Sequence, residues 1–180
     1  MRIISGKHKS KRIFAPKKLP VRPTTDMAKE ALFNILNNVY YFEDISALDL
    51  FAGTGNISFE FASRGTKELV AVDADYGSIK FIDKISDELD FGISTIKSDA
   101  FGFLEKSSLK VDIIFADPPY DLAPEDFAKI PKLVFKNQML LDDGMLIIEH
   151  SKHTDLSSLA HFSNQRRYGG SVFSFFTHKN

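Results

Sequence analysis

The stretch Asp117-Pro118-Pro119-Tyr120 places a carboxylate, two prolines and an aromatic ring directly after an apolar run, 111–116, that is long enough for a buried strand. Two consecutive prolines lack N–H groups and fix an extended backbone, so the loop has carbonyl oxygens without internal partners. The Asp117 carboxylate and the Pro118 carbonyl could each accept one N–H of an exocyclic amine, and Tyr120 offers a ring face for stacking a base. The alternative is a rigid loop with an aromatic plug.

A second stretch, 47–56, has the pattern of a strand, a tight turn and a helix start. Gly53 and Gly55 let the backbone approach a ligand closely, and the free N–H groups of a helix start favour a carboxylate or phosphate. Asp49 lies in the strand just before this turn, where it would repel a pyrophosphate and attract a cation. The turn therefore suits a ligand that carries both charges.

Two further aspartates follow the next two predicted strands, 68–73 and 93–97. Asp73 lies 24 residues beyond Asp49, close to where α/β nucleotide-binding folds place the carboxylate that accepts ribose hydroxyls. Asp99 could accept an adenine amino group. Each also has a simpler interpretation, because Asp73 could be a turn residue and Asp99 a helix N-cap.

These residues converge only if the strands are parallel neighbours, and the alternation of strands and helices predicts such a sheet. The fold class is α/β: a seven-stranded, mostly parallel, Rossmann-like sheet with an antiparallel C-terminal strand, preceded by a basic β-hairpin and a helix. Lys29 and Glu30 should face outward from that helix. We expect strands at 46–51, 68–73, 93–97, 111–116, 145–149, 162–168 and 172–177, and helices at 27–39, 56–64, 75–89, 100–106 and 125–136.

Charge is divided unevenly along the chain. The first 22 residues hold eight basic side chains and no acidic one, although the formal net charge of the whole chain is −1. Apolar residues interleaved with the basic ones predict a hairpin arm, 1–22, that binds a polyanion, ahead of a domain at 23–180. A solvated tail is the alternative. The candidate RNA-binding residues are the arm's Arg2, Lys7, Lys9, Lys11, Arg12 and Arg22, with Thr24 and Thr25 of the following helix start.

Composition excludes several other classes of protein and of site. The 180 residues include no cysteine, which excludes disulfides, thiolate metal sites and cysteine nucleophiles and fits a cytoplasmic protein. No apolar run approaches the roughly 20 residues that cross a bilayer, and the basic N-terminus does not suit a signal peptide. The histidines show no metal-ligand or triad spacing, so we expect no metal.

Asp-Leu-Phe-Ala-Gly-Thr-Gly at 49–55 with Asp-Pro-Pro-Tyr at 117–120 resembles the class I S-adenosylmethionine-dependent methyltransferases that act on exocyclic amines. Met-Arg-Ile-Ile-Ser-Gly-Lys at 1–7 and Arg-Pro-Thr-Thr-Asp at 22–26 are similar to the bacterial 16S rRNA guanine-N2 methyltransferases of the RsmD type. The resemblance spans nearly the whole chain. Met27 departs from it, because the family usually has a basic residue there.

The resemblance implies S-adenosylmethionine as cofactor, 16S rRNA or the assembling small ribosomal subunit as partner, and a monomeric protein that needs no membrane. It implies that Asp49 and the turn through Gly53, Gly55 and Asn56 hold the methionine part, that Asp73 binds the ribose hydroxyls, and that Asp99 with Ala100 lies by the adenine. Phe51 and Ala74 are further candidates for cofactor binding, and Asp117, Pro118 and Tyr120 are the candidate catalytic residues.

Other functions stay open at this point. A nicotinamide or flavin dinucleotide site would need a third glycine at position 58, which is Ser58. The same chemistry could act on DNA adenine or a protein glutamine, although the basic arm and the lack of a separate target-recognition domain favour RNA. A non-catalytic RNA-binding module would not need the intact glycine turn and Asp-Pro-Pro-Tyr.

Overall fold

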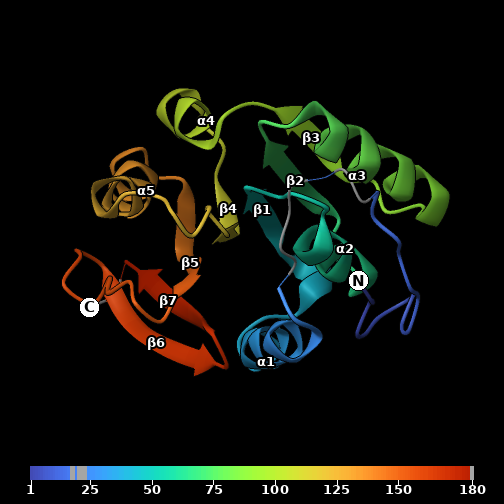
Figure 1. Ribbon diagram of the computed structural model, residues 1–180, viewed down its shortest axis with the longest axis horizontal. Helices are drawn as coiled ribbons and strands as arrows, with labels where there is room; N and C mark the ends of the chain where they lie inside the picture. The colour runs from blue at the N-terminus through green and yellow to red at the C-terminus, as the bar shows by residue number, and fades with distance from the viewer. Residues whose placement is uncertain (17–18, 20–23, 179–180) are drawn as a thin grey trace.

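The computed structural model describes residues 1–16, 19 and 24–178 as one mixed sheet covered by helices on both faces (Figure 1). The strand order is β3-β2-β1-β4-β5-β7-β6, and β7 is antiparallel to both of its neighbours. The elements are α1 (Asp26–Asn37), η1 (Phe42–Asp44), β1 (Ser46–Leu50), α2 (Asn56–Ser63), β2 (Glu68–Asp73), α3 (Tyr76–Leu89), β3 (Ser94–Lys97), α4 (Ala100–Lys106), β4 (Val111–Ala116), α5 (Pro124–Lys136), β5 (Leu140–Ser151), β6 (Phe162–Tyr168) and β7 (Ser171–Thr177). The predicted fold class is confirmed.

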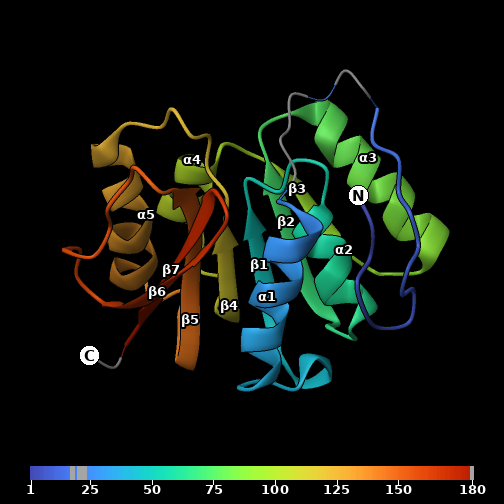
Figure 2. The same cartoon turned by 60° about the horizontal axis from the view of Figure 1, so that its bottom comes forward.

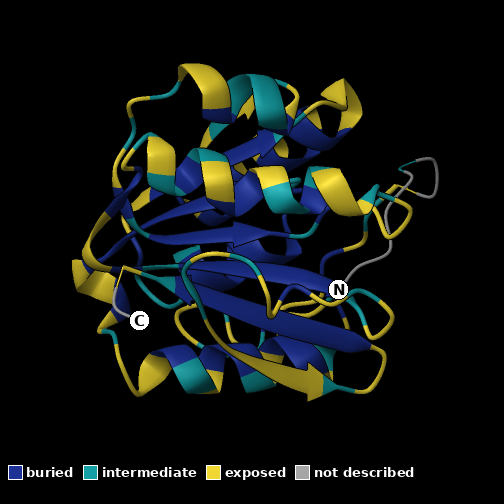
Figure 3. Ribbon diagram, turned by 90° about the vertical axis from the view of Figure 1, so that its left-hand side faces the viewer, coloured by how far each residue is buried: buried dark blue, intermediate teal, exposed yellow. Residues whose placement is uncertain are grey.

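The core has two layers because successive strand residues point to opposite faces of the sheet. Ile113 and Phe115 of β4 pack with α1, α2 and α3, whereas Ile114 and Ala116 pack with α4 and α5. Figure 3 shows the central strands buried between the helices, while the edge strand β6 is exposed. The sheet is therefore held from both sides, which fixes the loops at its edges.

The β1, β2, β3 and β4 ladders are parallel, so their carboxyl ends meet at one edge of the sheet. β5 differs from the expected strand at 145–149. It already begins at Leu140, and its ladder with β4 shifts register between Val111 and Ile113. Gly144 lies at this irregularity, where an added Cβ would be 2.9 Å from the Asp112 carbonyl oxygen. A bulge therefore joins residues 140–144 to the strand that was expected to begin at 145.

Helix α1 starts as expected, because the Thr25 side chain accepts a hydrogen bond from the Ala28 N–H. Its outward face differs from the prediction. Glu30 is exposed, but the Lys29 side chain is 1 % exposed and was wrongly expected to face the solvent. Its Nζ lies 3.5 Å from the buried Glu60 carboxylate of α2, so an ion pair stabilises a charge that burial alone would exclude.

The N-terminal arm, 1–16, forms a hairpin with one antiparallel bridge between Arg2 and Arg12. Ile3 and Ile13 are buried in the same core as the sheet. The arm turns back beside the ends of α2 and α3, at the edge of the sheet opposite the carboxyl ends of the parallel strands (Figure 2). The expected boundary between residues 22 and 23 lies outside the described residues.

No helix in the described part of the chain is both long and apolar enough to cross a membrane.

Candidate active site

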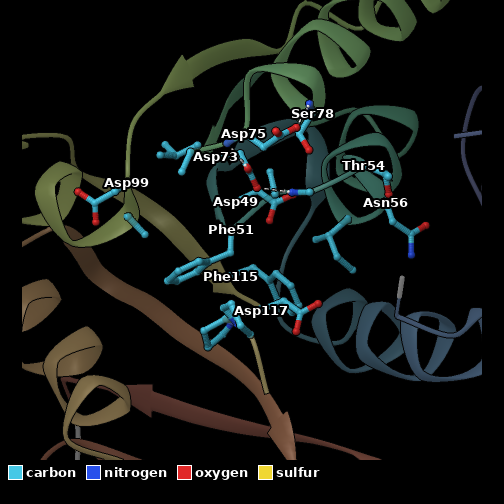
Figure 4. Close-up of a pocket in the computed structure, with 18 of the residues that line it drawn as sticks. Asp49, Phe51, Thr54, Asn56, Asp73, Asp75, Ser78, Asp99, Phe115 and Asp117 are labelled. Atoms are coloured by element: carbon cyan, nitrogen blue, oxygen red, sulfur yellow. Dashed lines mark hydrogen bonds between the residues drawn. The ribbon is translucent and has the colours of Figure 1, made fainter. Parts of the chain in front are cut away.

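A cavity of about 560 Å³ opens at the carboxyl ends of β1, β2 and β4. Such edges are where open α/β sheets bind ligands. Figure 4 shows Asp49 and Asp73 on one side of this cavity, Asp99 at one end and Asp117 on the β4 side. Its lining includes every residue expected to bind the cofactor or to be catalytic, except Gly55: Asp49, Phe51, Gly53, Asn56, Asp73, Ala74, Asp99, Ala100, Asp117, Pro118 and Tyr120.

The turn between β1 and α2 depends on left-handed backbone conformations. Gly53 and Gly55 have φ values of 52° and 75°, and Phe51 adopts a φ of 59° despite its side chain. An added Cβ at Gly55 would lie 2.9 Å from the Ile82 side chain. Gly55 therefore lies beneath the turn and shapes it, while its neighbours face the cavity.

Asp49 is buried beneath this turn, with a side chain that accepts hydrogen bonds from the backbone N–H and the hydroxyl of Ser58. Burial raises the pKa of the Asp49 carboxyl to about 7, against the lowering effect of the Ser58 hydrogen bonds and with a smaller raising contribution from Asp73. A cationic ligand group next to this buried carboxyl would favour the ionised form of the carboxyl, because opposite charges attract.

Asp73 and Asp99 both line the cavity and both bond to nearby backbone N–H groups. Asp73 accepts from Gly53 at 2.7 Å and from Asp75 at 2.8 Å, which fixes the turn against the end of β2. Asp99 is the N-cap of α4, with bonds of 3.0 Å to the N–H groups at positions 101 and 102. The N-cap interpretation of Asp99 is thus observed. Each carboxylate retains further lone pairs for a ligand.

The loop after β4 forms the facing wall. The Asp117 N–H donates to the Leu50 carbonyl oxygen at 3.3 Å, which ties this loop to β1. Pro118 is buried, and the Tyr120 side chain is 40 % exposed at the rim. The loop is thus fixed to the strand that leads into the glycine turn.

A buried polar network behind the turn was not predicted from the sequence. Lys29 Nζ donates to Asn56 Oδ1 at 2.7 Å, and Asn56 Nδ2 donates to the Thr24 carbonyl at 3.0 Å. The Thr24 hydroxyl in turn donates to Glu149 of β5 at 2.7 Å. Burial lowers the pKa of Lys29, although Glu60 opposes that effect. The network fixes the first residue of α2 at the cavity.

One signal could have revealed Lys29: it lies four residues before Phe33 and three before Leu32, so it falls on the buried stripe of α1. Thr24 and Glu149 carry no comparable signal, because their contact joins residues 125 positions apart.

Of the expected RNA-binding residues that the structure describes, Thr24 lines the cavity and the basic side chains of the arm do not. Lys9, Lys11 and Arg12 are exposed on the arm, whose tip hydrogen-bonds the last residues of α2 and α3 through the backbone of Lys7 and the ring of His8. Arg2 pairs with Asp26 at 3.0 Å and Lys7 with Asp90 at 3.8 Å, Thr24 is buried, Thr25 caps α1, and Arg22 lies outside the described residues. α3 has 14 residues, so the arm tip lies roughly 20 Å along that helix from the cavity edge.

No group of three or more His, Asp or Glu side chains within the described ranges is arranged to hold a metal ion.

Comparisons with known proteins agree with this geometry. A family described as "Conserved hypothetical protein 95" matches residues 1–177. The chain is 32% identical over 152 residues to the ribosomal RNA small subunit methyltransferase D of Buchnera aphidicola subsp. Baizongia pistaciae, covering 83% of this chain and 75% of that protein. It is 29% identical over 169 residues to the protein of the same name from Escherichia coli K12, covering 88% and 79%.

A solved structure of a hypothetical protein from Thermus thermophilus superposes with a TM-score of 0.85 at 22% identity, covering 98% of this chain and 99% of that one. This structural similarity shows the fold. The family match, together with the curated relatives, shows the protein family. The chain belongs to the family described as Conserved hypothetical protein 95, the RsmD-type class I S-adenosylmethionine-dependent methyltransferases.

Proposed function

We propose that this protein transfers a methyl group from S-adenosylmethionine to the exocyclic 2-amino group of a guanine in 16S rRNA. The observation that carries the proposal is one cavity with two different walls. The β1–α2 turn and Asp73 form a wall suited to a zwitterionic nucleoside, and Asp117-Pro118-Pro119-Tyr120 forms a wall suited to an aromatic amine. The strand that leads into the turn, β1, and the strand that leads into Asp117, β4, are adjacent in one sheet, so donor and acceptor can meet.

The chemical groups of S-adenosylmethionine suit the first wall. It supplies an electrophilic methyl on a sulfonium and carries an ammonium and a carboxylate, with no phosphate. Asp49 balances the cationic groups, and the positive end of the α2 helix dipole suits the carboxylate. Asp73 accepts hydrogen bonds from the ribose hydroxyls, while Asp99 and Ala100 lie beside the adenine.

The second wall can activate the exocyclic amine of guanine, which is a poor nucleophile. The lone pair of a guanine amino group is delocalised into the ring, so the nitrogen must become more tetrahedral before it attacks. The Asp117 carboxylate and the Pro118 carbonyl accept hydrogen bonds from the two N–H groups of this amine and favour its tetrahedral geometry. Tyr120 stacks on the base. As the new C–N bond forms and the C–S bond breaks, positive charge develops on nitrogen, and Asp117 stabilises it. The proton then leaves to water or to Asp117.

The names of the curated relatives and the exposed charges of the arm support ribosomal RNA as the substrate. The arm's rigid attachment, through two backbone N–H groups that donate to Glu60, would place its cations on RNA distant from the methylated base. We place this activity in the cytoplasm, where ribosomal subunits assemble, and in a monomer, because both walls come from one chain.

The test uses 16S rRNA and small subunits from a strain that lacks the gene, methylated by purified protein with isotopically labelled cofactor. Digestion and mass spectrometry should find N2-methylguanosine at one position. Asp117→Asn is the matched control, because it keeps the side-chain shape and should bind cofactor with greatly reduced transfer. Label on adenosine would overturn the guanine assignment, and absence of label from RNA would overturn the substrate class.

A further inference from the structure

A second cavity, of about 290 Å³, lies beside the first at the carboxyl end of β5 and the start of α5. Leu122 lines both cavities, which places them next to each other. The second cavity is on the side away from β2 and β3, next to the loop proposed to hold the target amine. Its lining residues are Leu122, Pro124, Phe127, His153, Thr154, Asp155, Leu156 and Leu159.

The floor of this cavity is apolar and firmly packed, because Phe127 and Leu156 are 1 % and 3 % exposed. Its outer wall is the loop after β5, where the Thr154 N–H donates to the Ser151 carbonyl oxygen at 3.1 Å. This turn holds the exposed ring of His153 and the exposed carboxylate of Asp155 at the cavity.

Asp155 determines which kind of ligand fits. Its carboxylate accepts the Ser157 N–H at 2.9 Å, and this hydrogen bonding lowers the pKa of Asp155, so the group is ionised at neutral pH. An ionised carboxylate repels a phosphate and accepts N–H groups. An apolar floor, an imidazole ring and an acceptor together suit a flat base that carries an amino group.

We infer that this second cavity binds the base of a nucleotide next to the methylated one, which rests on the proposed function. A base can reach the first cavity only when it leaves its stack, and its neighbours on the strand then lie at the mouth of that cavity. The shared Leu122 wall puts the second cavity within reach of a neighbour. His153 stacks on this base and Asp155 accepts its amino group. The site therefore reads sequence beside the target.

The experiment uses a short RNA fragment that contains the guanine mapped in the rRNA assay. Three versions are prepared: the natural fragment and two in which the nucleotide before or after the target is abasic. Wild-type protein, His153→Ala and Asp155→Asn are compared with Ser158→Ala, a control in the same loop whose side chain lies outside the cavity lining. The readouts are KM for each RNA, kcat and cofactor affinity.

Wild-type protein and the control should lose about tenfold or more in kcat/KM with one of the abasic fragments, in line with the contribution of a stacked base. His153→Ala and Asp155→Asn should show a raised KM on the natural fragment, a smaller loss with that abasic fragment, and unchanged cofactor affinity.

Two results would overturn the inference while leaving the proposed function intact: equal abasic losses in all four proteins, or natural-fragment kinetics of His153→Ala and Asp155→Asn that match wild type. Absence of methylation on rRNA, subunits and fragments alike would reject the proposed function itself, and the neighbouring-base site with it.

Discussion

Asp49 gives the sharpest quantitative prediction, because its protonation should respond to cofactor binding. Burial raises its pKa from an ordinary 3.8 to about 7. That difference corresponds to about 4 kcal/mol in favour of the neutral carboxyl. A cationic cofactor group favours the ionised carboxylate, so below pH 7 the bound state must release a proton. Affinity should therefore weaken as the pH falls.

The assay is calorimetric titration with S-adenosylhomocysteine, which retains the ammonium and carboxylate, between pH 5.5 and 7.5. Affinity should fall as pH drops below 7, with a slope that approaches tenfold per pH unit. Titrations in two buffers of different ionisation enthalpy should show proton release that approaches one per ligand near pH 6.

Asp49→Asn keeps the side-chain shape and an oxygen that can accept the Ser58 hydrogen bond. At pH 7.5 this variant should bind about ten- to a hundredfold more weakly, because hydrogen bonds to charged groups contribute about 1.5–3 kcal/mol. It should lack the slope and the proton release that wild type shows. The buried His150, whose pKa burial lowers, is present in both proteins and cancels in the comparison.

The free energy of unfolding should depend on pH in the opposite direction to cofactor affinity, because the pKa of Asp49 is higher in the folded state than in the unfolded state. The preference for the neutral carboxyl is fully present below about pH 4 and is lost as pH rises through about 7. Urea unfolding should show wild type losing up to about 4 kcal/mol relative to Asp49→Asn across that window. This role of Asp49 would be refuted if wild type and Asp49→Asn showed the same pH dependence of cofactor affinity and the same pH dependence of unfolding.

Asp117→Ala should lower single-turnover methyl transfer by at least about ten- to a hundredfold while cofactor affinity by calorimetry changes little; equal losses in both would move Asp117 to the cofactor wall. Gly6→Ala should lower the melting temperature measured by calorimetry, because φ is +83° and an added Cβ would lie 1.8 Å from a backbone carbonyl of α2; an unchanged melting temperature would mean that the arm is not packed this tightly. Glutamate at Lys9, Lys11 and Arg12 should flatten the salt dependence of rRNA binding in filter assays, with cofactor affinity unchanged; a slope equal to that of wild type would remove the arm from the RNA interface.

Much of the site could be predicted because its signals are local. Gly53 and Gly55 mark the turn. Asp73 ends one apolar strand pattern and Asp117 directly follows another, so both positions can be identified from the neighbouring residues alone. Parallel pairing then brings both to one edge. Short-range patterns of this kind fixed most element boundaries to within a few residues.

The missed features depend on contacts between distant segments. Lys29 lies on the buried stripe of α1, but its charged group can be buried only because Glu60 and Asn56 of α2 lie opposite it. Likewise, β5 begins at Leu140 because this residue pairs with Val111 of β4. The docking of the arm beside the ends of α2 and α3 is likewise tertiary. Sequence reasoning therefore predicted the arm's charge but could not predict its distance from the cavity.

A crystal structure with S-adenosylhomocysteine bound tests the central claim most directly. The account predicts that the sulfur faces Asp117 and Pro118 across a space that admits a purine, with the ammonium beside Asp49 and the ribose hydroxyls on Asp73. A sulfur turned away from Asp117, or too little room between them for a base, would contradict it.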